Sequence, residues 1–202
     1  MFKKIMVIII VFVCLLSVST ISAADPNDDV AGANDVGNFA DLATDISAGG
    51  NISLTRDYIQ TDSFGEITIN MDTIIDGNGH TIDAQGKSRI FNIATGLNVT
   101  LKNINFINGN ITGTSLSTGS GGAIYNNGGE NDNSGLSVVN STFKDNAASR
   151  DGGAIYSRYV NLTVIDSTFI NTTSDDDGGA IYASLVYNRT ALVINSTFIN
   201  TT

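Results

Sequence analysis

The chain has few of the residues on which folding and catalysis most often depend. It has no tryptophan and only one proline, one histidine and one cysteine. Cys14 lies in an N-terminal apolar stretch, so the rest of the chain has no thiol for a disulfide or for thiol chemistry. Lysine and arginine total 10 against 20 aspartates and glutamates, and no basic cluster offsets this excess. Because so acidic a chain repels nucleic acid and anionic lipid surfaces, we exclude nucleic acid as a partner.

The segment 1–24 has the pattern of a secretory signal peptide. Two lysines precede an apolar run from Ile5 to Leu16, and small residues follow as far as Ala24. This run is too short for a membrane-spanning helix, which needs about 20 residues. We expect cleavage after Ala24, with Ala23 as the alternative cleavage position and a retained N-terminal anchor as the alternative fate.

Cleavage after Ala24 would leave a mature protein comprising residues 25–202. Because the signal peptide carries two lysines and no acidic residue, its removal would change the net charge from −10 to −12. We expect this mature protein to be secreted or held at the cell surface and to have no membrane span.

The segment after the signal peptide divides into a leader and a short helix. Residues 25–37 are rich in Asp, Asn, Gly and Ala and are predicted to form a flexible leader. We expect a capping helix over 38–50, because Asn38 is a typical N-cap residue and Gly49-Gly50 is a typical stop. Such a helix would cover the open end of a repeat structure. Its apolar residues recur at helical spacing: Phe39, Leu42, Ala43 and Ile46.

The most informative feature is an internal repeat. The sequence Gly-Gly-Ala-Ile-Tyr occurs three times, and each copy is followed by Ser-Thr-Phe. Both elements recur with a period of roughly 30 residues, which indicates a solenoid, in which each repeat buries its apolar face only by stacking on its neighbours. The copies start at Gly121, Gly152 and Gly178, and at Ser141, Ser167 and Ser196.

From residue 51 onward the sequence consists of short β segments broken by Gly, Asn and Asp, without a helical pattern. Parallel strands without crossover helices must coil directly from one to the next, which predicts an all-β parallel β-helix over 51–202, uncapped at its C-terminal coil. One of these β segments is Leu97–Asn105, and we expect a loop in the serine-rich stretch Gly113–Gly122.

Aligning the repeats predicts two ladders and a second aromatic stack. The pattern Leu136-x-Val138-x-Asn140-x-x-Phe143 recurs around Val99, Leu162 and, less well, as Leu192-x-Ile194. Equivalent residues in successive coils would lie about 4.8 Å apart. We therefore predict an internal phenylalanine column and a polar ladder at the preceding bend, whose members are Phe106, Phe143, Phe169 and Phe198, and Asn103, Asn140, Asp166 and Asn195. Tyr125, Tyr156 and Tyr182 would form a further stack, either an exposed sugar-binding surface or ordinary packing, which we favour.

Asn-x-Ser/Thr sequons are dense, and in an exported glycoprotein each is a potential glycan acceptor. An inward-pointing ladder would prevent modification of Asn140 and Asn195, and a further sequon begins at Asn200. Asn, Ser and Thr also fill β-helix turns, so we expect only a minority to be modified. The candidates are Asn51, Asn98, Asn110, Asn161, Asn171 and Asn188.

These repeats resemble those of polymorphic outer-membrane proteins, which are marked by Gly-Gly-Ala-Ile and Phe-x-x-Asn. The first element is complete in all three copies, and the second only at Phe143–Asn146; Gly109, Thr172 and Thr201 replace its Asn elsewhere. The stretch 75–83 is similar to the first coils of pectin-lyase-like β-helices. The resemblance covers about 70–202 and implies a right-handed parallel β-helix with a surface or adhesive role, and no defined ligand.

Candidates for catalysis are few. The best cation candidates are Asp175, Asp176 and Asp177, which could bind calcium weakly through oxygen, although we favour a solvated turn. Arg158 and the pair Arg150-Asp151 lie near one repeat. His80 has no partner at ligand spacing, and we interpret it as a turn residue. We predict no catalytic residue and no cofactor.

The prediction is therefore a secreted or cell-surface, adhesin-like β-helix protein that interacts with carbohydrate or with other cells. One alternative is a polysaccharide lyase or glycoside hydrolase of the pectin-lyase-like fold. A second is a structural cell-envelope component that self-associates through its open C-terminal coil.

Overall fold

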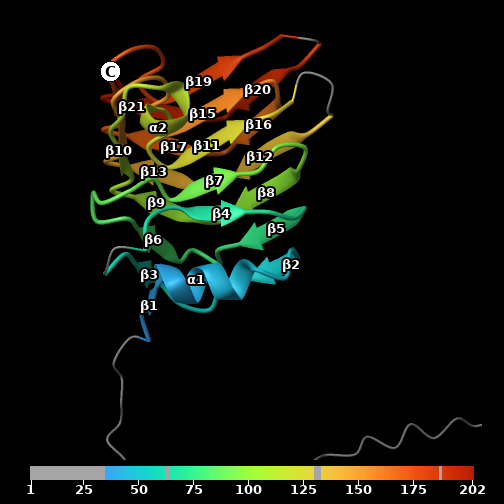
Figure 1. Cartoon of the computed structure of the whole chain (residues 1–202), viewed down its shortest axis with the longest axis vertical. Helices are drawn as coiled ribbons and strands as arrows, with labels where there is room; N and C mark the ends of the chain where they lie inside the picture. Colours follow the sequence, from blue (N-terminus) through green and yellow to red (C-terminus); the bar gives the residue numbers. More distant parts are fainter. Residues whose placement is uncertain (1–34, 62–63, 130–132, 187) are drawn as a thin grey trace, which may run out of the picture. The chain divides into compact units, whose positions relative to one another are not determined.

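The computed structural model describes residues 35–61, 64–129, 133–186 and 188–202. In these ranges short strands wind into successive coils, and each coil adds strands to a set of stacked sheets (Figure 1). The strands pair in parallel throughout, with identical repeat positions opposite one another. The fold is therefore a parallel β-helix, as the sequence predicts. The predicted signal peptide, and leader residues 25–34, lie outside the described residues.

The described strands form four sheets. The seven-stranded sheet contains, in order, β1 (Gly37–Asn38), β3 (Tyr58–Ile59), β6 (Thr81–Asp83), β9 (Asn105–Ile107), β13 (Thr142–Lys144), β17 (Thr168–Ile170) and β21 (Thr197–Ile199). The six-stranded sheet contains β2 (Gly50–Ser53), β5 (Thr73–Asp76), β8 (Asn98–Lys102), β12 (Gly135–Val139), β16 (Asn161–Ile165) and β20 (Ala191–Ile194). The five-stranded sheet contains β4 (Ile67–Ile69), β7 (Phe91–Ile93), β11 (Ile124–Asn127), β15 (Ile155–Arg158) and β19 (Ile181–Ser184). The three-stranded sheet contains β10 (Asn110–Ile111), β14 (Ala147–Ala148) and β18 (Thr173–Ser174).

The helix α1 (Phe39–Ile46) lies at the end of the coils opposite β19–β21 (Figure 1). Asn38 caps it: the Asn38 side chain accepts from the Asp41 backbone N–H, and the Asp41 carboxylate accepts from the Asn38 backbone N–H. The buried face of the helix joins the core of the coils. The helix is shorter than the predicted span because the chain turns after Ile46, and Gly37, expected in the leader, pairs in β1.

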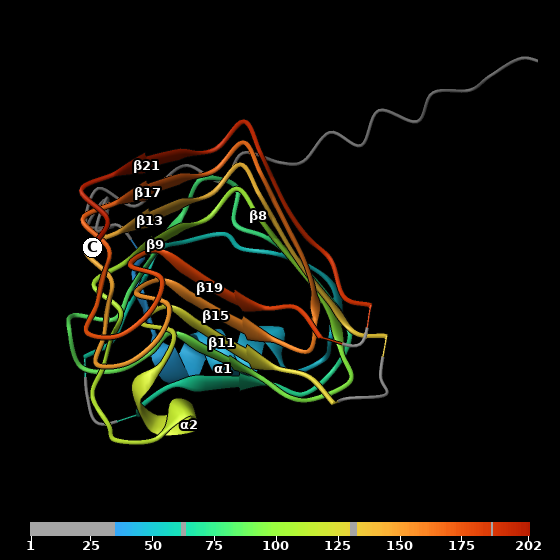
Figure 2. The same ribbon diagram turned by 90° about the horizontal axis from the view of Figure 1, so that it is seen from above.

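The core is enclosed by the sheets, as the view along the coils shows (Figure 2). Four phenylalanines of the seven-stranded sheet form one column, and the first three of them lie inside this core. Their ring centroids are 4.7, 4.8 and 4.9 Å apart in sequence order, and the rings are nearly parallel. Phe91 meets the first member edge-on at 6.0 Å. The column consists of Phe106, Phe143, Phe169 and Phe198.

The predicted β segment Leu97–Asn105 is divided between two strands, because the chain turns a corner at Asn103, where the polar ladder predicts a bend. This residue has a φ of +56°, in the left-handed region that asparagine tolerates better than most residues. The strand therefore ends as β8, and β9 starts in the adjacent sheet. Asn140, Asp166 and Asn195 have the same conformation at the same corner of later coils. The polar ladder thus marks the boundary between two sheets.

The alignment of the last coil also needs correction. The sequence alignment placed Leu192 opposite Leu162, but the structure pairs Ala191 with Leu162 and Val193 with Val164. The corner residue fixes the register here: Ile194 lies opposite Ile165, immediately before the corner. Leu192 therefore points outward and is exposed.

The serine-rich stretch predicted as a loop contains a one-turn helix, α2 (Leu116–Gly119). Ser115 and Thr118 cap each other in the same reciprocal arrangement that starts α1. A single turn is too short to show a helical period, which is why the pattern gave no signal. In the described part of the chain, no helix has the length and hydrophobicity that a membrane crossing requires.

Candidate functional site

The repeat motif occupies the bend before β15 and the strand β13, where several of its residues are fixed by contact with neighbouring coils. Gly152 has a φ of +70°, and a Cβ there would overlap the carbonyl oxygen of Ile155. Gly153 has no room either, because the neighbouring coil's Gly179 carbonyl lies against it. Ala154 is completely buried. Gly152 is therefore required by its backbone conformation and by packing, and Gly153 by packing alone.

Asn146, the Asn of the Phe-x-x-Asn element, is completely buried and hydrogen-bonded to the previous coil. Its Oδ1 accepts from the Gly109 N–H at 2.8 Å, and its Nδ2 donates to the Phe106 carbonyl at 3.1 Å. Phe143, three residues earlier, belongs to the phenylalanine column. The motif thus joins two coils through one aromatic and one amide contact.

Residues 140–158 match the model of the Chlamydia polymorphic membrane protein repeat. This segment contains the one complete Phe-x-x-Asn element together with the second Gly-Gly-Ala-Ile-Tyr. A search of curated proteins and a search of solved structures each gave no match. The match to this repeat is consistent with the parallel β-helix that the stacked sheets form. The predicted similarity of 75–83 to pectin-lyase-like coils stays a prediction.

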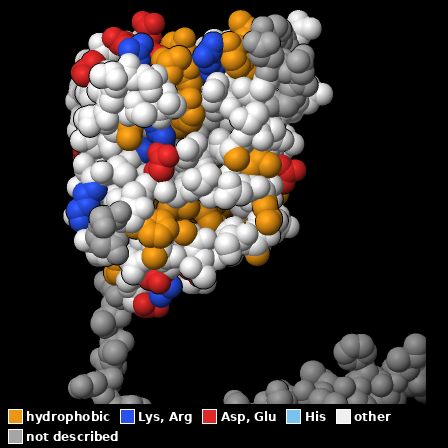
Figure 3. All heavy atoms as spheres, viewed as in Figure 1, with side chains coloured by type: hydrophobic (Ala, Val, Ile, Leu, Met, Phe, Trp, Pro, Cys, Tyr) orange, Lys and Arg blue, Asp and Glu red, His pale blue; other side chains and the backbone are white. Residues whose placement is uncertain are grey.

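The tyrosines of the three Gly-Gly-Ala-Ile-Tyr copies, Tyr125, Tyr156 and Tyr182, stack on the outer side of the five-stranded sheet. Their centroids are 5.0 and 5.2 Å apart, with rings within 4° of parallel. Tyr125 is 8% exposed and Tyr156 only 1%, whereas Tyr182 in the last coil is half-buried. Burial raises the pKa of Tyr156 to about 12, and the neighbouring Tyr125 adds to the effect. The stack is thus a covered packing element over most of its length. Figure 3, which views this face, shows a strip of hydrophobic side chains, a class that includes tyrosine, with charged side chains beside it.

Arg89 covers one end of the tyrosine stack, and the sequence analysis did not single it out. It is 1% exposed, and its guanidinium carbon lies 4.7 Å from the Tyr125 ring centroid. It pairs with Glu66 at 2.5 Å and donates to the carbonyls of Ser117, Ser120 and Gly121. Burial lowers the pKa of Arg89, and Glu66 opposes that shift. Arg89 thus holds α2 against the coils. The sequence pointed to this role only by placing a single arginine between Ser88 and Ile90.

The corner ladder between the six- and seven-stranded sheets faces outward and borders an open groove. Asn140 Nδ2 donates to Asn103 Oδ1 at 2.8 Å, and Asn103 Nδ2 donates to Asp76 at 2.9 Å. The pKa of Asp76 falls to about 2 because it accepts from Asn103, from the Asn78 N–H and from Lys102. The groove is lined by Asn78, Gly79, Asn103, Asn105, Asn140 and Thr142. It offers amide and hydroxyl groups at a spacing set by the coils.

The acidic run does not converge into one site. Asp176 pairs with Arg150 at 3.3 Å, and the Asp177 N–H donates to Asp151. Across the described ranges, no three acidic, histidine or cysteine side chains gather as a metal site would require. His80 Nδ1 lies 3.0 Å from an Asp57 oxygen, which also accepts from the Thr81 N–H. The Thr81 N–H and His80 lower the pKa of Asp57.

The predicted glycan acceptors all reach the surface, with one half-buried. Asn161 is half-buried and accepts from the Thr190 N–H at 3.1 Å. Asn171 is engaged in a second corner ladder, donating to Asp145 and accepting from Asn200. Asn140 and Asn195, which an inward ladder would have hidden, are also exposed. Glycosylation of any of them stays a prediction. The exposed acceptors are Asn51, Asn98, Asn110, Asn171 and Asn188.

Proposed function

We propose that this protein is a secreted or cell-surface, adhesin-like β-helix module that binds carbohydrate through its outward corner groove. The polymorphic repeat in 140–158 supports a surface role, since the matching repeat comes from a membrane protein. The observation that carries the proposal is the amide-lined groove at the corner of β8–β9 and β12–β13. Sugars present hydroxyls that both donate and accept, and amides match both functions.

The hydrogen bonds within the ladder leave the groove rich in acceptors. Because Asn140 donates to Asn103 and Asn103 donates to Asp76, one of the two N–H groups of each amide is used within the ladder. Asn105 Nδ2 is likewise used by the Gly79 carbonyl. The side-chain oxygens of Asn105 and Asn140 and the Thr142 hydroxyl are then available to sugar O–H groups. The rigid coils hold these acceptors in place, which lowers the ordering cost of binding.

The test is a glycan-array screen of the protein comprising residues 25–202, followed by calorimetry on the glycans it retains. Asn140→Ala and Thr142→Val should each weaken binding about tenfold, as expected for loss of one hydrogen bond of about 1.4 kcal/mol. Thr163→Val is the matched control, because Thr163 faces outward from β16 on the six-stranded sheet. No retained glycan, or an equal loss for Thr163→Val, would overturn the groove as the site. New reducing ends or unsaturated uronate in the same mixtures would support the lyase or hydrolase alternative instead.

A second candidate, self-association, is favoured by the coil formed by β19, β20 and β21. Val193 and Phe198 are 45% and 44% exposed, although their counterparts in the preceding coil, Val164 and Phe169, are fully buried. In the described residues these strands are the last of the five-, six- and seven-stranded sheets, and an unpaired strand edge can pair with another chain. Because α1 closes the opposite end, two copies would meet through this same face. Light scattering on residues 25–202 should detect a dimer that Val193→Lys abolishes; a monomer at high concentration argues against it.

A further inference from the structure

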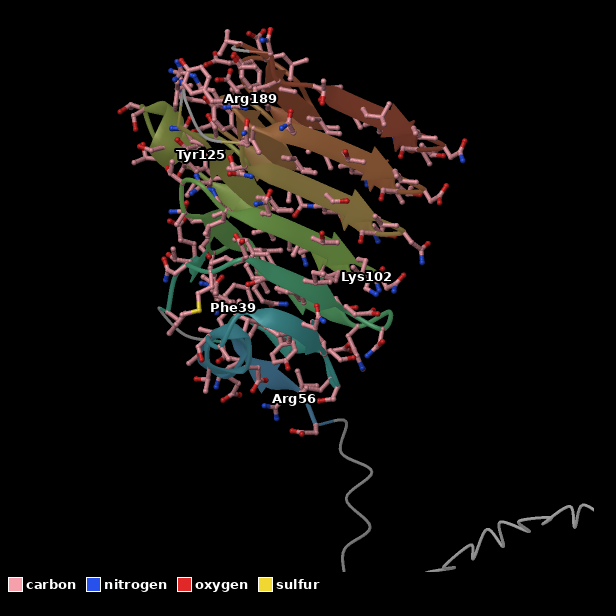
Figure 4. All side chains as sticks on the ribbon, turned by 90° about the vertical axis from the view of Figure 1, so that its right-hand side faces the viewer. Phe39, Arg56, Lys102, Tyr125 and Arg189 are labelled. Atoms are coloured by element: carbon pink, nitrogen blue, oxygen red, sulfur yellow. The ribbon has the colours of Figure 1, made fainter. Side chains whose placement is uncertain are left out.

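Two arginines from different coils meet at one tyrosine, away from the corner groove. Arg158 ends β15, and its guanidinium carbon lies 4.3 Å from the ring centroid of Tyr159, whose hydroxyl accepts from Arg158. Arg189 lies just before β20, and its Nε donates to the Tyr159 carbonyl at 3.1 Å. We call Arg158, Tyr159 and Arg189 the arginine corner. Figure 4 shows Arg189 toward the end of the coils that is opposite Phe39 and Arg56.

The arginine corner carries charge that no carboxylate within the described residues neutralises. Arg56, Arg89 and Arg150 each pair with an aspartate or glutamate. Arg158 instead contacts Tyr159 and Tyr156, and Arg189 contacts a backbone carbonyl and the neutral side-chain oxygen of Asn133. Both arginines are half-buried, which strengthens their field compared with fully solvated side chains. The arginine corner therefore attracts an anion, although the chain as a whole has 20 acidic residues.

Tyr159 itself has an unfavourable backbone conformation. Its φ of +60° places a bulky aromatic residue in the left-handed region, whereas most other non-glycine residues there are asparagines or aspartates. Such a conformation is unfavourable for an L-residue other than glycine, asparagine or aspartate. The Tyr159 N–H donates to the Ser184 carbonyl of the next coil at 3.2 Å, which helps to hold the turn. Strain of this kind gathers at positions that contact ligands.

We propose that the arginine corner binds the carboxylate of an acidic sugar in a short glycan. The proposal rests on the carbohydrate-binding function above and adds the chemical class of the ligand. A planar guanidinium matches a carboxylate through two parallel N–H···O bonds, which favours a carboxylate over an uncharged sugar. Tyr182, half-buried at the end of the tyrosine stack one coil along, supplies an aromatic face for a sugar ring.

The overall charge restricts the ligand to a short glycan or a single acidic residue. A long polyuronate would lie over the acidic remainder of the surface and be repelled, while a short ligand meets only the local positive field. Leu185 and Val186, 47% and 39% exposed on the same β19–β20 connection, place apolar surface beside the corner. This combination suits the apolar face and the single charge of one uronic acid.

The experiment compares a glucuronate-containing disaccharide with its carboxyl-reduced counterpart, using calorimetry on residues 25–202. We expect the acidic sugar to bind at least tenfold more tightly, with the difference shrinking as salt screens the contact. Arg158→Gln and Arg189→Gln should each weaken binding of the acidic sugar about tenfold without changing binding of the neutral one. Arg150→Gln is the matched control, because Arg150 is already paired with Asp176.

The outcomes separate this proposal from the groove. Equal binding of the two sugars, or an equal loss for Arg150→Gln, would overturn the arginine corner and leave the groove intact. Absence of binding for both disaccharides would also overturn the corner, while the glycan array with Asn140→Ala judges the groove independently. Arg158→Lys tests whether misfolding causes the loss of binding, because it keeps the positive charge and removes the planar guanidinium. An intermediate loss of binding to the acidic sugar, with an unchanged melting temperature, supports the arginine corner.

Discussion

Replacing Phe143 by alanine tests whether the phenylalanine column holds the coils together. Phe143 is fully buried between Phe106 and Phe169, with centroids at 4.7 and 4.8 Å. Truncating a buried phenylalanine costs about 3–5 kcal/mol, and each stacked pair contributes roughly 0.5–1.5 kcal/mol beyond the buried area. We therefore expect Phe143→Ala to lower the free energy of unfolding by about 4 kcal/mol.

Phe198 provides the matched control, because it has the same position in the last coil and a different environment. It is 44% exposed and stacks only on Phe169, at 4.9 Å. With roughly half the burial and one ring neighbour, Phe198→Ala should cost about 1–2 kcal/mol. Fraying of a terminal coil would reduce that effect further.

Urea unfolding followed by circular dichroism measures both changes, with the slope of the transition compared between variants. The expected result is a large shift of the midpoint for Phe143→Ala and a small one for Phe198→Ala. Equal shifts would refute the reasoning, since they would mean that stacking on both sides contributes nothing beyond local hydrophobicity. Phe143→Leu keeps most of the buried area and should recover most of the lost stability.

Three further predictions concern the polar contacts. The depressed pKa of Asp76 means that the carboxylate's contribution to stability is present above its ordinary pKa of 3.8 and is lost as the pH falls toward about 2. Asp76→Asn should cost about 1 kcal/mol of stability at pH 7 and flatten the dependence of stability on pH between pH 4 and 2. A dependence as steep as that of the parent protein would contradict this. Arg89→Met should destabilise by about 3–5 kcal/mol, because Glu66 loses its ion-pair partner and three carbonyls lose a hydrogen bond. Faster hydrogen exchange in α2 is the readout, and unchanged exchange there would show that Arg89 does not hold the helix. Asn146→Ala should lower stability by about 2 kcal/mol, because two buried backbone groups lose their hydrogen-bond partner. Threonine occupies the equivalent position of the next coil, so Asn146→Thr should lower the melting temperature less. Equal melting temperatures for the two variants would argue against the amide contact.

The sequence by itself determined the repeating architecture. Residues that recur at the same place in each repeat must stack when parallel strands coil, so alternation and spacing were enough to predict the phenylalanine column. The helix signal at Asn38 sufficed for α1, because a capping residue and three apolar positions agree locally. The polymorphic repeat added a likeness to a known family, and that likeness covers only residues 140–158.

Only the tertiary structure decided what covers the outer faces and which corners meet. Alternation shows that a side chain points outward, but Arg89, which lies over the Tyr125 ring, and α2, to which Arg89 donates, come from connections without any period. The sequence predicted the bend at Asn195, but the structure decided the register of β20, in which Ile194 lies opposite Ile165 immediately before that corner. Arg158 and Arg189 belong to successive repeats and lie far apart in the chain, and the stacking of the coils brings both to Tyr159.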